Sequence, residues 1–183
     1  MSLAILLGLA GCATAPIPMV QTPLRTAAEI TRFQLVGRLQ VRSGERNAVV
    51  GVDWEHSETR DVWLFTGPLG QGLARIESDQ GGARMTLVDG RRADAPTAAE
   101  LAESVLGVSA PFAELPRWAT GRPRPDAELR ATDALGRPGR IVDRGWTIDY
   151  LEYMGDLSGD LPRKIDVHQG DTRLRLIVDA WNP

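Results

Sequence analysis

The sequence predicts a mainly β protein of α+β type, in which an antiparallel sheet curves into an incomplete barrel and a helical lid covers an apolar cavity. Apolar and polar residues alternate over most of the chain after Phe33, which is typical of strands with one buried face. Short turn signals separate these runs, so consecutive strands can pair as antiparallel neighbours. A helical block between residues 97 and 121 interrupts the strands and can cover the apolar face that an open sheet leaves bare.

Five strands are expected in the first half of the domain. The first has apolar residues at odd positions, and the second carries Ala48, Val50, Val52 and Trp54 on one face. In the third strand, four apolar residues follow one another at positions 62–65, so alternation does not decide its inner face, and we assign Leu64 to it. The expected strand bounds are 33–42, 48–54, 61–66, 73–78 and 83–87.

Helical spacing replaces alternation after these strands. Thr97 and Glu100 have the spacing of a capping box, and apolar residues follow at helical intervals until Gly107 ends the helix. A second short helical segment is expected from residues 111 to 121, and a further one at residues 25–32.

Four more strands are expected at residues 139–142, 146–153, 164–168 and 173–181. A barrel of more than about eight strands leaves interior space that side chains cannot fill. An apolar cavity is therefore expected between the sheet and the helices.

The start of the chain resembles a bacterial lipoprotein signal. Residues 3–11 are apolar or small and end in Leu9-Ala10-Gly11-Cys12. The run is far shorter than the roughly 20 residues that span a bilayer, but it has the length of a signal-peptide core. Cys12 is the only cysteine, which suits a thiol used for acylation in an oxidising compartment. The alternative is an ordinary signal peptide with an unrelated cysteine.

This interpretation divides the chain into three parts: a signal peptide at residues 1–11, an acylated cysteine and flexible tether at 12–24, and one folded domain at 25–183. The tether contains three prolines and is expected to be extended. Ala13 follows the cysteine where an inner-membrane retention signal would have Asp, which favours the outer membrane. No basic residue precedes the apolar run, so a start codon upstream of Met1 stays open.

Composition offers no sign of nucleic-acid binding or catalysis. The net charge is −3, and the two histidines, His56 and His168, lack the spacing of a metal site or a catalytic triad. Both are expected to be solvated surface residues. We therefore expect no enzyme activity, no metal and no cofactor.

A set of ordered motifs resembles the LolB family of outer-membrane lipoprotein receptors over nearly the whole mature chain. The motifs are Phe33-x-x-x-Gly37-Arg38-Leu39, a strand closing at Trp54, Gly67-Pro68-Leu69-Gly70, Leu115-x-x-Trp118-x-x-Gly121, Gly145-Trp146-x-Ile148-x-Tyr150 and Leu174-x-Leu176 followed by Trp181.

The resemblance implies an incomplete barrel of about eleven strands under a helical lid, similar in fold to the carrier LolA. It also implies that the protein accepts lipoproteins from a LolA-like periplasmic carrier and inserts them into the inner leaflet of the outer membrane. The expected partners are that carrier, the acyl chains of client lipoproteins and outer-membrane phospholipid. We expect a monomer that is anchored at Cys12 and faces the periplasm.

Two candidate sites follow. Pro68, Leu69 and Gly70 form a turn, where a large aliphatic side chain is unusual. The resemblance implies that Leu69 enters the bilayer during delivery, and the alternative is that it folds back onto the sheet.

The second site is the acyl cavity, although each residue assigned to it could instead serve ordinary core packing. Its expected lining from the strands is Leu39, Val41, Val50, Val52, Trp54, Leu64, Ile76, Met85, Leu87, Trp146, Ile148, Leu176 and Val178, covered from the helices by Leu101, Val105, Leu115 and Trp118. The alternative function is that of a lipocalin-like lipid-binding lipoprotein or an assembly lipoprotein of the outer membrane.

Overall fold

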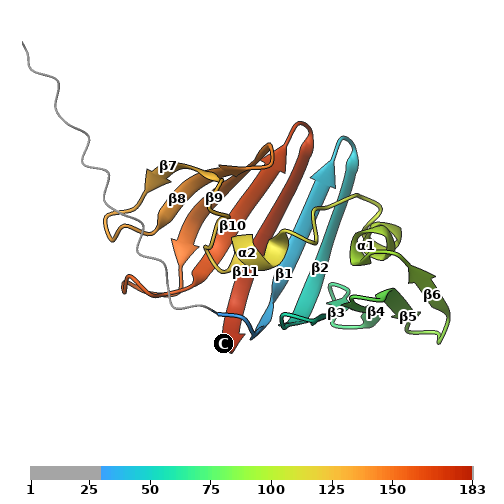
Figure 1. Ribbon diagram of the computed structural model, residues 1–183. Coiled ribbons are helices and arrows are strands. Elements are labelled where there is room, and N and C mark those ends of the chain that lie inside the picture. Colours follow the sequence, from blue (N-terminus) through green and yellow to red (C-terminus); the bar gives the residue numbers. More distant parts are fainter. Residues whose placement is uncertain (1–29, 183) are drawn as a thin grey trace, which may run out of the picture.

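The computed structural model describes residues 30–182, which form eleven strands and two helices (Figure 1). The elements are β1 (Phe33–Ser43), β2 (Arg46–His56), β3 (Arg60–Thr66), β4 (Gly72–Asp79), β5 (Gly82–Leu87), β6 (Arg92–Ala95), α1 (Ala98–Leu106), α2 (Leu115–Ala119), β7 (Glu128–Thr132), β8 (Pro138–Asp143), β9 (Trp146–Tyr153), β10 (Pro162–Gln169) and β11 (Thr172–Asn182). The signal peptide, Cys12 and the tether predicted from the sequence lie outside the described residues.

All eleven strands belong to one antiparallel sheet in the order β6-β5-β4-β3-β2-β1-β11-β10-β9-β8-β7. Each half of the chain is a meander, and the pairing of β1 with β11 joins the two halves. The edge strands β6 and β7 do not pair with each other, so the sheet stays open. Figure 1 shows the sheet curving around α1 and α2, which lie on its concave side. The predicted incomplete barrel with a helical lid is confirmed.

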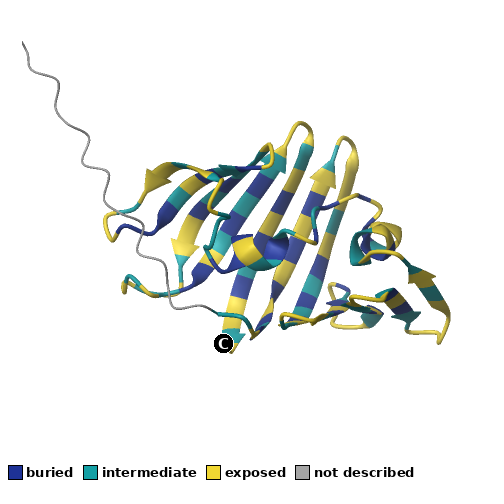
Figure 2. Cartoon of the chain, viewed as in Figure 1, coloured by how far each residue is buried: buried dark blue, intermediate teal, exposed yellow. Residues whose placement is uncertain are grey.

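Alternating burial explains why the nine strands predicted from the pattern are present. In β1 and β11, buried and exposed residues alternate along the strand (Figure 2). The pattern did not predict β6 and β7, which are short edge strands with no buried residue. Such strands carry little periodic signal, because only the partly buried Ala93 and Ala95 of β6 and Leu129 of β7 pack against the core.

Gly37 shows why one position of the first motif requires glycine. The register of β1 against β11 shifts between Val36 and Gly37. A Cβ atom built at Gly37 would lie 2.2 Å from the carbonyl oxygen of Ile177. Only a residue without a side chain allows this close approach of the two strands.

The first helix begins and ends where the sequence predicts. The hydroxyl of Thr97 accepts a hydrogen bond from the backbone N–H of Glu100, which caps the first turn. Gly107 adopts a left-handed conformation with φ of 70°, and its N–H bonds to the carbonyl of Glu103.

The other helical predictions need correction. The segment expected at residues 111–121 contains only the five-residue α2, because residues 110–115 form separate turns. Residues 30–32 of the helix expected at 25–32 have no regular structure, and residues 25–29 lie outside the described residues. No helix among residues 30–182 has the length and apolarity needed to cross a bilayer.

The assignment of Leu64 to the inner face is wrong. Cross-strand register pairs Trp63 with Trp54 and Phe65 with Val52, so these two aromatic residues of β3 face inward. Leu64 lies opposite Asp53 and Arg75 on the outer face, where 37% of it is exposed. A shift of one residue in the register between two strands moves every side chain of a strand to the opposite face. Only the pairing of β3 with β2 decides which side chains of β3 face inward.

Candidate functional site

The concave side of the sheet and the two helices enclose one apolar cluster. It contains most of the predicted cavity residues, namely Leu39, Val41, Val50, Val52, Trp54, Ile76, Met85, Leu101, Leu115, Trp118, Ile148, Leu176 and Val178. Leu87, Val105 and Trp146 are partly buried and pack against it. The sequence therefore identified this interior well, apart from Leu64.

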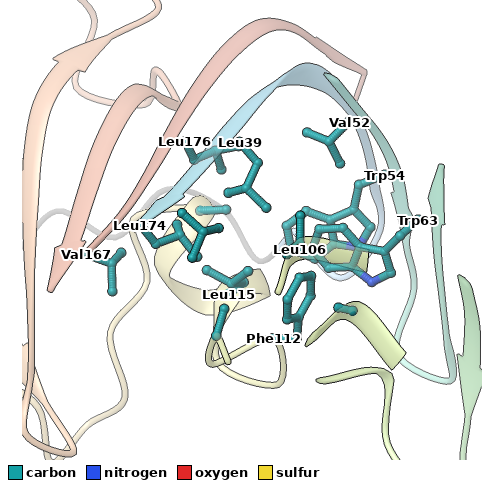
Figure 3. Close-up of a cluster of buried hydrophobic side chains, with 14 of the residues drawn as sticks. Leu39, Val52, Trp54, Trp63, Leu106, Phe112, Leu115, Val167, Leu174 and Leu176 are labelled. Atoms are coloured by element: carbon teal, nitrogen blue, oxygen red, sulfur yellow. The ribbon is translucent and has the colours of Figure 1, made fainter. Parts of the chain in front are cut away.

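Aromatic residues that the sequence did not assign to the site fill one side of this interior. The rings of Trp54 and Trp63 stack with centroids 3.8 Å apart, and Phe112 meets Trp63 edge-on at 5.0 Å (Figure 3). Phe65 also faces Phe112, at 6.3 Å. Phe112 comes from the segment between the helices, so this aromatic cluster joins the lid to the first half of the sheet.

A buried carboxylate ties the lid to the second half of the sheet. The indole N–H of Trp118 in α2 donates to Oδ2 of Asp143 at 2.9 Å, and Arg124 approaches Oδ1 at 3.0 Å. Asp143 is only 2% exposed, so these partners offset the cost of burying its charge. Trp118 and Asp143 are 25 residues apart, and no local pattern in the sequence predicts their contact.

A second ion pair strengthens the same connection. Glu114, which precedes α2, accepts a hydrogen bond from Arg144 at 2.5 Å, and Arg124 lies 3.8 Å from the same carboxylate oxygen. Arg144 lies in the turn between β8 and β9, directly after Asp143. The lid is thus attached to this turn by both a buried and a partly buried carboxylate.

Tyr150 brings a polar atom into the apolar interior. Its hydroxyl is buried and has no hydrogen-bond partner among the described residues. Burial raises the pKa of Tyr150 well above its usual value, and the neighbouring Tyr153 and Asp143 raise it further. The hydroxyl therefore stays protonated as a neutral donor.

The turn between β3 and β4 projects Leu69 into solvent. The N–H of Gly67 bonds to the carbonyl of Gln71 at 2.8 Å, and the N–H of Gly70 bonds to the carbonyl of Gly67 at 2.9 Å. Gly70 has a φ of 80°, a conformation that favours glycine. Leu69 is 93% exposed, so the alternative in which it folds back onto the sheet is wrong.

The histidines differ in their surroundings. His56 ends β2 and is half-buried, with Nδ1 2.8 Å from Asp61 and its ring 4.9 Å from that of Phe33. The expectation of a solvated His56 is therefore wrong. His168 is more exposed and lies 3.3 Å from Asp149. Within residues 30–182, no group of three or more His, Cys, Asp or Glu side chains is arranged to hold a metal ion.

Comparison with known proteins supports one family. The family model described as "Outer membrane lipoprotein LolB" matches residues 31–181. The outer-membrane lipoprotein LolB of Azoarcus sp. (strain BH72) is 37% identical over 173 residues, which cover 94% of this chain and 89% of the relative. That of Thiobacillus denitrificans is 42% identical over 176 residues, covering 94% and 91%. A solved LolA superfamily protein from Nitrosomonas europaea aligns with a TM-score of 0.49 and 10% identity, over 86% of this chain and 88% of that one.

Proposed function

This chain belongs to the LolB family of outer-membrane lipoproteins, and from that membership we propose how it handles its clients. Its function is that of an outer-membrane lipoprotein receptor in lipoprotein localisation. In our proposal, the apolar interior receives the acyl chains of a lipoprotein from a LolA-like periplasmic carrier. The protein then passes them to the inner leaflet of the outer membrane. We further propose that it works as a monomer, anchored through acylated Cys12 and facing the periplasm.

The observation that supports this proposal most strongly is the apolar interior between sheet and lid. Acyl chains need an apolar environment, and the inner strand residues supply one that Leu101, Leu115 and Trp118 cover. These covering residues are themselves buried, so a ligand reaches the interior only when the lid shifts.

Transfer along this route needs no chemical reaction, and we propose that the protein is not an enzyme. Each tenfold step in affinity corresponds to about 1.4 kcal/mol. A receptor that holds acyl chains somewhat more tightly than the carrier therefore draws clients towards the membrane.

Leu69 is the proposed contact with the bilayer during delivery, together with Pro68 and Gly70 of its turn. Burying a leucine side chain in an apolar phase is worth about 1.5–3 kcal/mol. Because Leu69 projects from the sheet, it can enter lipid without any change in the interior.

A two-stage transfer assay tests this function. Leu69→Glu should fold normally and accept a lipoprotein from the carrier, but fail to pass it to liposomes, because a carboxylate resists entering the acyl region. Client bound to the receptor should then accumulate. Leu69→Ile and Leu69→Phe serve as controls and should be tolerated, since only apolarity and reach are required.

The two stages must be scored separately. If acceptance and delivery are lost together, or if the melting temperature falls strongly, Leu69 belongs to the fold and the proposed bilayer contact is wrong. If the wild-type protein binds acyl chains but takes no client from the carrier, it is a lipid-binding lipoprotein of the lipocalin-like kind instead.

A further inference from the structure

The outward orientation of Leu64 reveals an apolar patch on the outer face of the sheet. Leu64 shares a shallow depression with Leu73 and Val88 on β3, β4 and the turn after β5. Val88 is 78% exposed. Leu73 is partly buried and also packs against the core. Outer faces of antiparallel sheets are usually polar where they meet water, so the exposed Leu64 and Val88 need a reason.

The patch adjoins the turn that carries Leu69. Strands β3 and β5 run in the same direction on either side of β4, so the turns that follow them lie at the same end of the sheet. β4 begins at Gly72, so Leu73 is its second residue and follows closely on the turn of Leu69. The N–H of Val88 donates to the carbonyl of Leu73 at 3.3 Å. Leu69 and Val88 are also the two most exposed large hydrophobic residues between positions 30 and 182.

The two turns have the same hydrogen-bonded geometry. The N–H of Leu87 bonds to the carbonyl of Arg91 at 2.8 Å, and the N–H of Gly90 bonds to the carbonyl of Leu87 at 2.9 Å. Gly90 has a φ of 85°, close to the 80° of Gly70 in the other turn. Each turn is therefore closed by its own backbone, and each holds an aliphatic side chain away from the core.

We propose that Val88, with Leu64 and Leu73 behind it, forms a second bilayer contact beside Leu69. This inference rests on the proposed delivery role, and the occupant is the phospholipid surface of the membrane. One inserted residue leaves the protein free to tilt on the membrane. Two inserted turns at one end of the sheet restrict that tilt and orient the barrel towards the bilayer.

The composition of the patch favours lipid over a protein partner. Protein interfaces are enriched in aromatic residues, whereas no aromatic residue lines the depression that holds Leu64, Leu73 and Val88. Of the cations near the patch, Arg91 pairs with Asp89 at 2.6 Å, and Arg75 shares the carboxylate of Glu77 with Arg60. Arg75 lines the depression and Arg92 lies opposite Thr86 of the same depression, so guanidinium groups border the aliphatic surface, which suits contact with phospholipid phosphates.

Val88→Glu in the full acylated chain tests this proposal, in vesicles of phosphatidylethanolamine and phosphatidylglycerol. We expect delivery to fall about tenfold, as for the loss of one buried aliphatic side chain. Uptake from the carrier and the melting temperature should not change, since Val88 lies in an exposed turn.

Val88→Leu should behave as wild type. Leu157→Glu is the matched control, because Leu157 is 71% exposed and lies in the loop after β9, at the opposite end of the sheet.

A polarity-sensitive fluorophore attached to Val88→Cys measures the contact directly. Its emission should shift to the blue when vesicles bind, whereas the same label at Leu157→Cys should not respond.

The inference is overturned if Val88→Glu delivers normally while Leu69→Glu does not, an outcome that leaves the proposed function intact. It is also overturned if Val88→Glu loses uptake from the carrier, since the patch would then bind protein. If Leu69→Glu and Val88→Glu both deliver normally, bilayer insertion by this end of the sheet is wrong altogether.

Discussion

Tyr150 carries a buried hydroxyl that has no hydrogen-bond partner within the described part of the chain. Leaving such a group unpaired costs about 1–3 kcal/mol. Tyr150→Phe removes the hydroxyl and keeps the ring, so we expect the free energy of unfolding to rise by about 1–2 kcal/mol. Urea denaturation at neutral pH measures the change.

Tyr153→Phe is the matched control for this prediction. The hydroxyl of Tyr153 donates to the carbonyl of Pro138 at 2.6 Å, so its removal loses a hydrogen bond. We expect Tyr153→Phe to be destabilising by about 1 kcal/mol. A loss of stability in Tyr150→Phe would show that its hydroxyl does have a partner in solution.

At the scale of elements, α2 is the part of the lid that depends most on one residue. Trp118 fills the interior and also bonds to Asp143. We expect Trp118→Ala to weaken the binding of a fluorescent hydrophobic probe and to lower the free energy of unfolding by about 3–5 kcal/mol. Competition between the probe and a fatty acid measures the first effect.

Trp118→Phe separates packing from the hydrogen bond, because it keeps an aromatic ring but loses the indole N–H. We expect its probe affinity to lie between those of wild type and Trp118→Ala. If folded Trp118→Ala binds the probe with wild-type affinity, α2 has no part in covering the ligand site.

The hairpin of β7 and β8 depends on Asp133. Its carboxylate accepts hydrogen bonds from the side chain of Arg137 at 2.6 Å and from the backbone N–H groups of Leu135 and Arg137 at 2.9 Å. Burial raises the pKa of Asp133, but these bonds outweigh it and hold the pKa below its usual value of 3.8. Arg137 also stacks 3.9 Å from the ring centre of Tyr153, which links the hairpin to β9.

This pKa predicts how stability depends on pH. Because the folded-state pKa is depressed, the Asp133 carboxylate contributes stability above pH 3.8 and loses it as pH falls through the folded-state pKa. Asp133→Asn should cost about 1–3 kcal/mol at pH 7. The difference from wild type should shrink below pH 3.8. Urea denaturation across this range measures both, and a difference that does not vary with pH would contradict the proposed role of the charge.

At the scale of the whole molecule, the anchor and the folded domain are expected to be independent. Cys12 lies outside the described residues, whereas the sheet and lid form within residues 30–182. Cys12→Ala should therefore fold with an unchanged melting temperature but no longer fractionate with the outer membrane. Retention of this variant in the outer-membrane fraction at high salt would show that another feature holds the protein there.

Local patterns in the sequence determined, for most elements, whether a segment forms a strand or a helix. Alternation requires only that one face of a strand be buried, so nine strands could be predicted before any pairing was known. The boundaries of α1 were equally local, since Thr97 and Gly107 act within one helical turn. The exposed turn at Leu69 was visible for the same reason, because its conformation depends on neighbouring residues.

Tertiary structure decided what depends on contacts between distant residues. The inner face of β3 was set by the pairing of Trp63 with Trp54, which left Leu64 on the outside. The bond between Trp118 and Asp143 joins a helix to a strand end 25 residues later. The turns that carry Leu69 and Val88 lie at the same end of the sheet only because β3 and β5 flank β4. The physical reason is that the spacing of apolar residues along a segment reflects which of its residues are buried. Register and packing partners depend instead on how all the strands of the sheet pair.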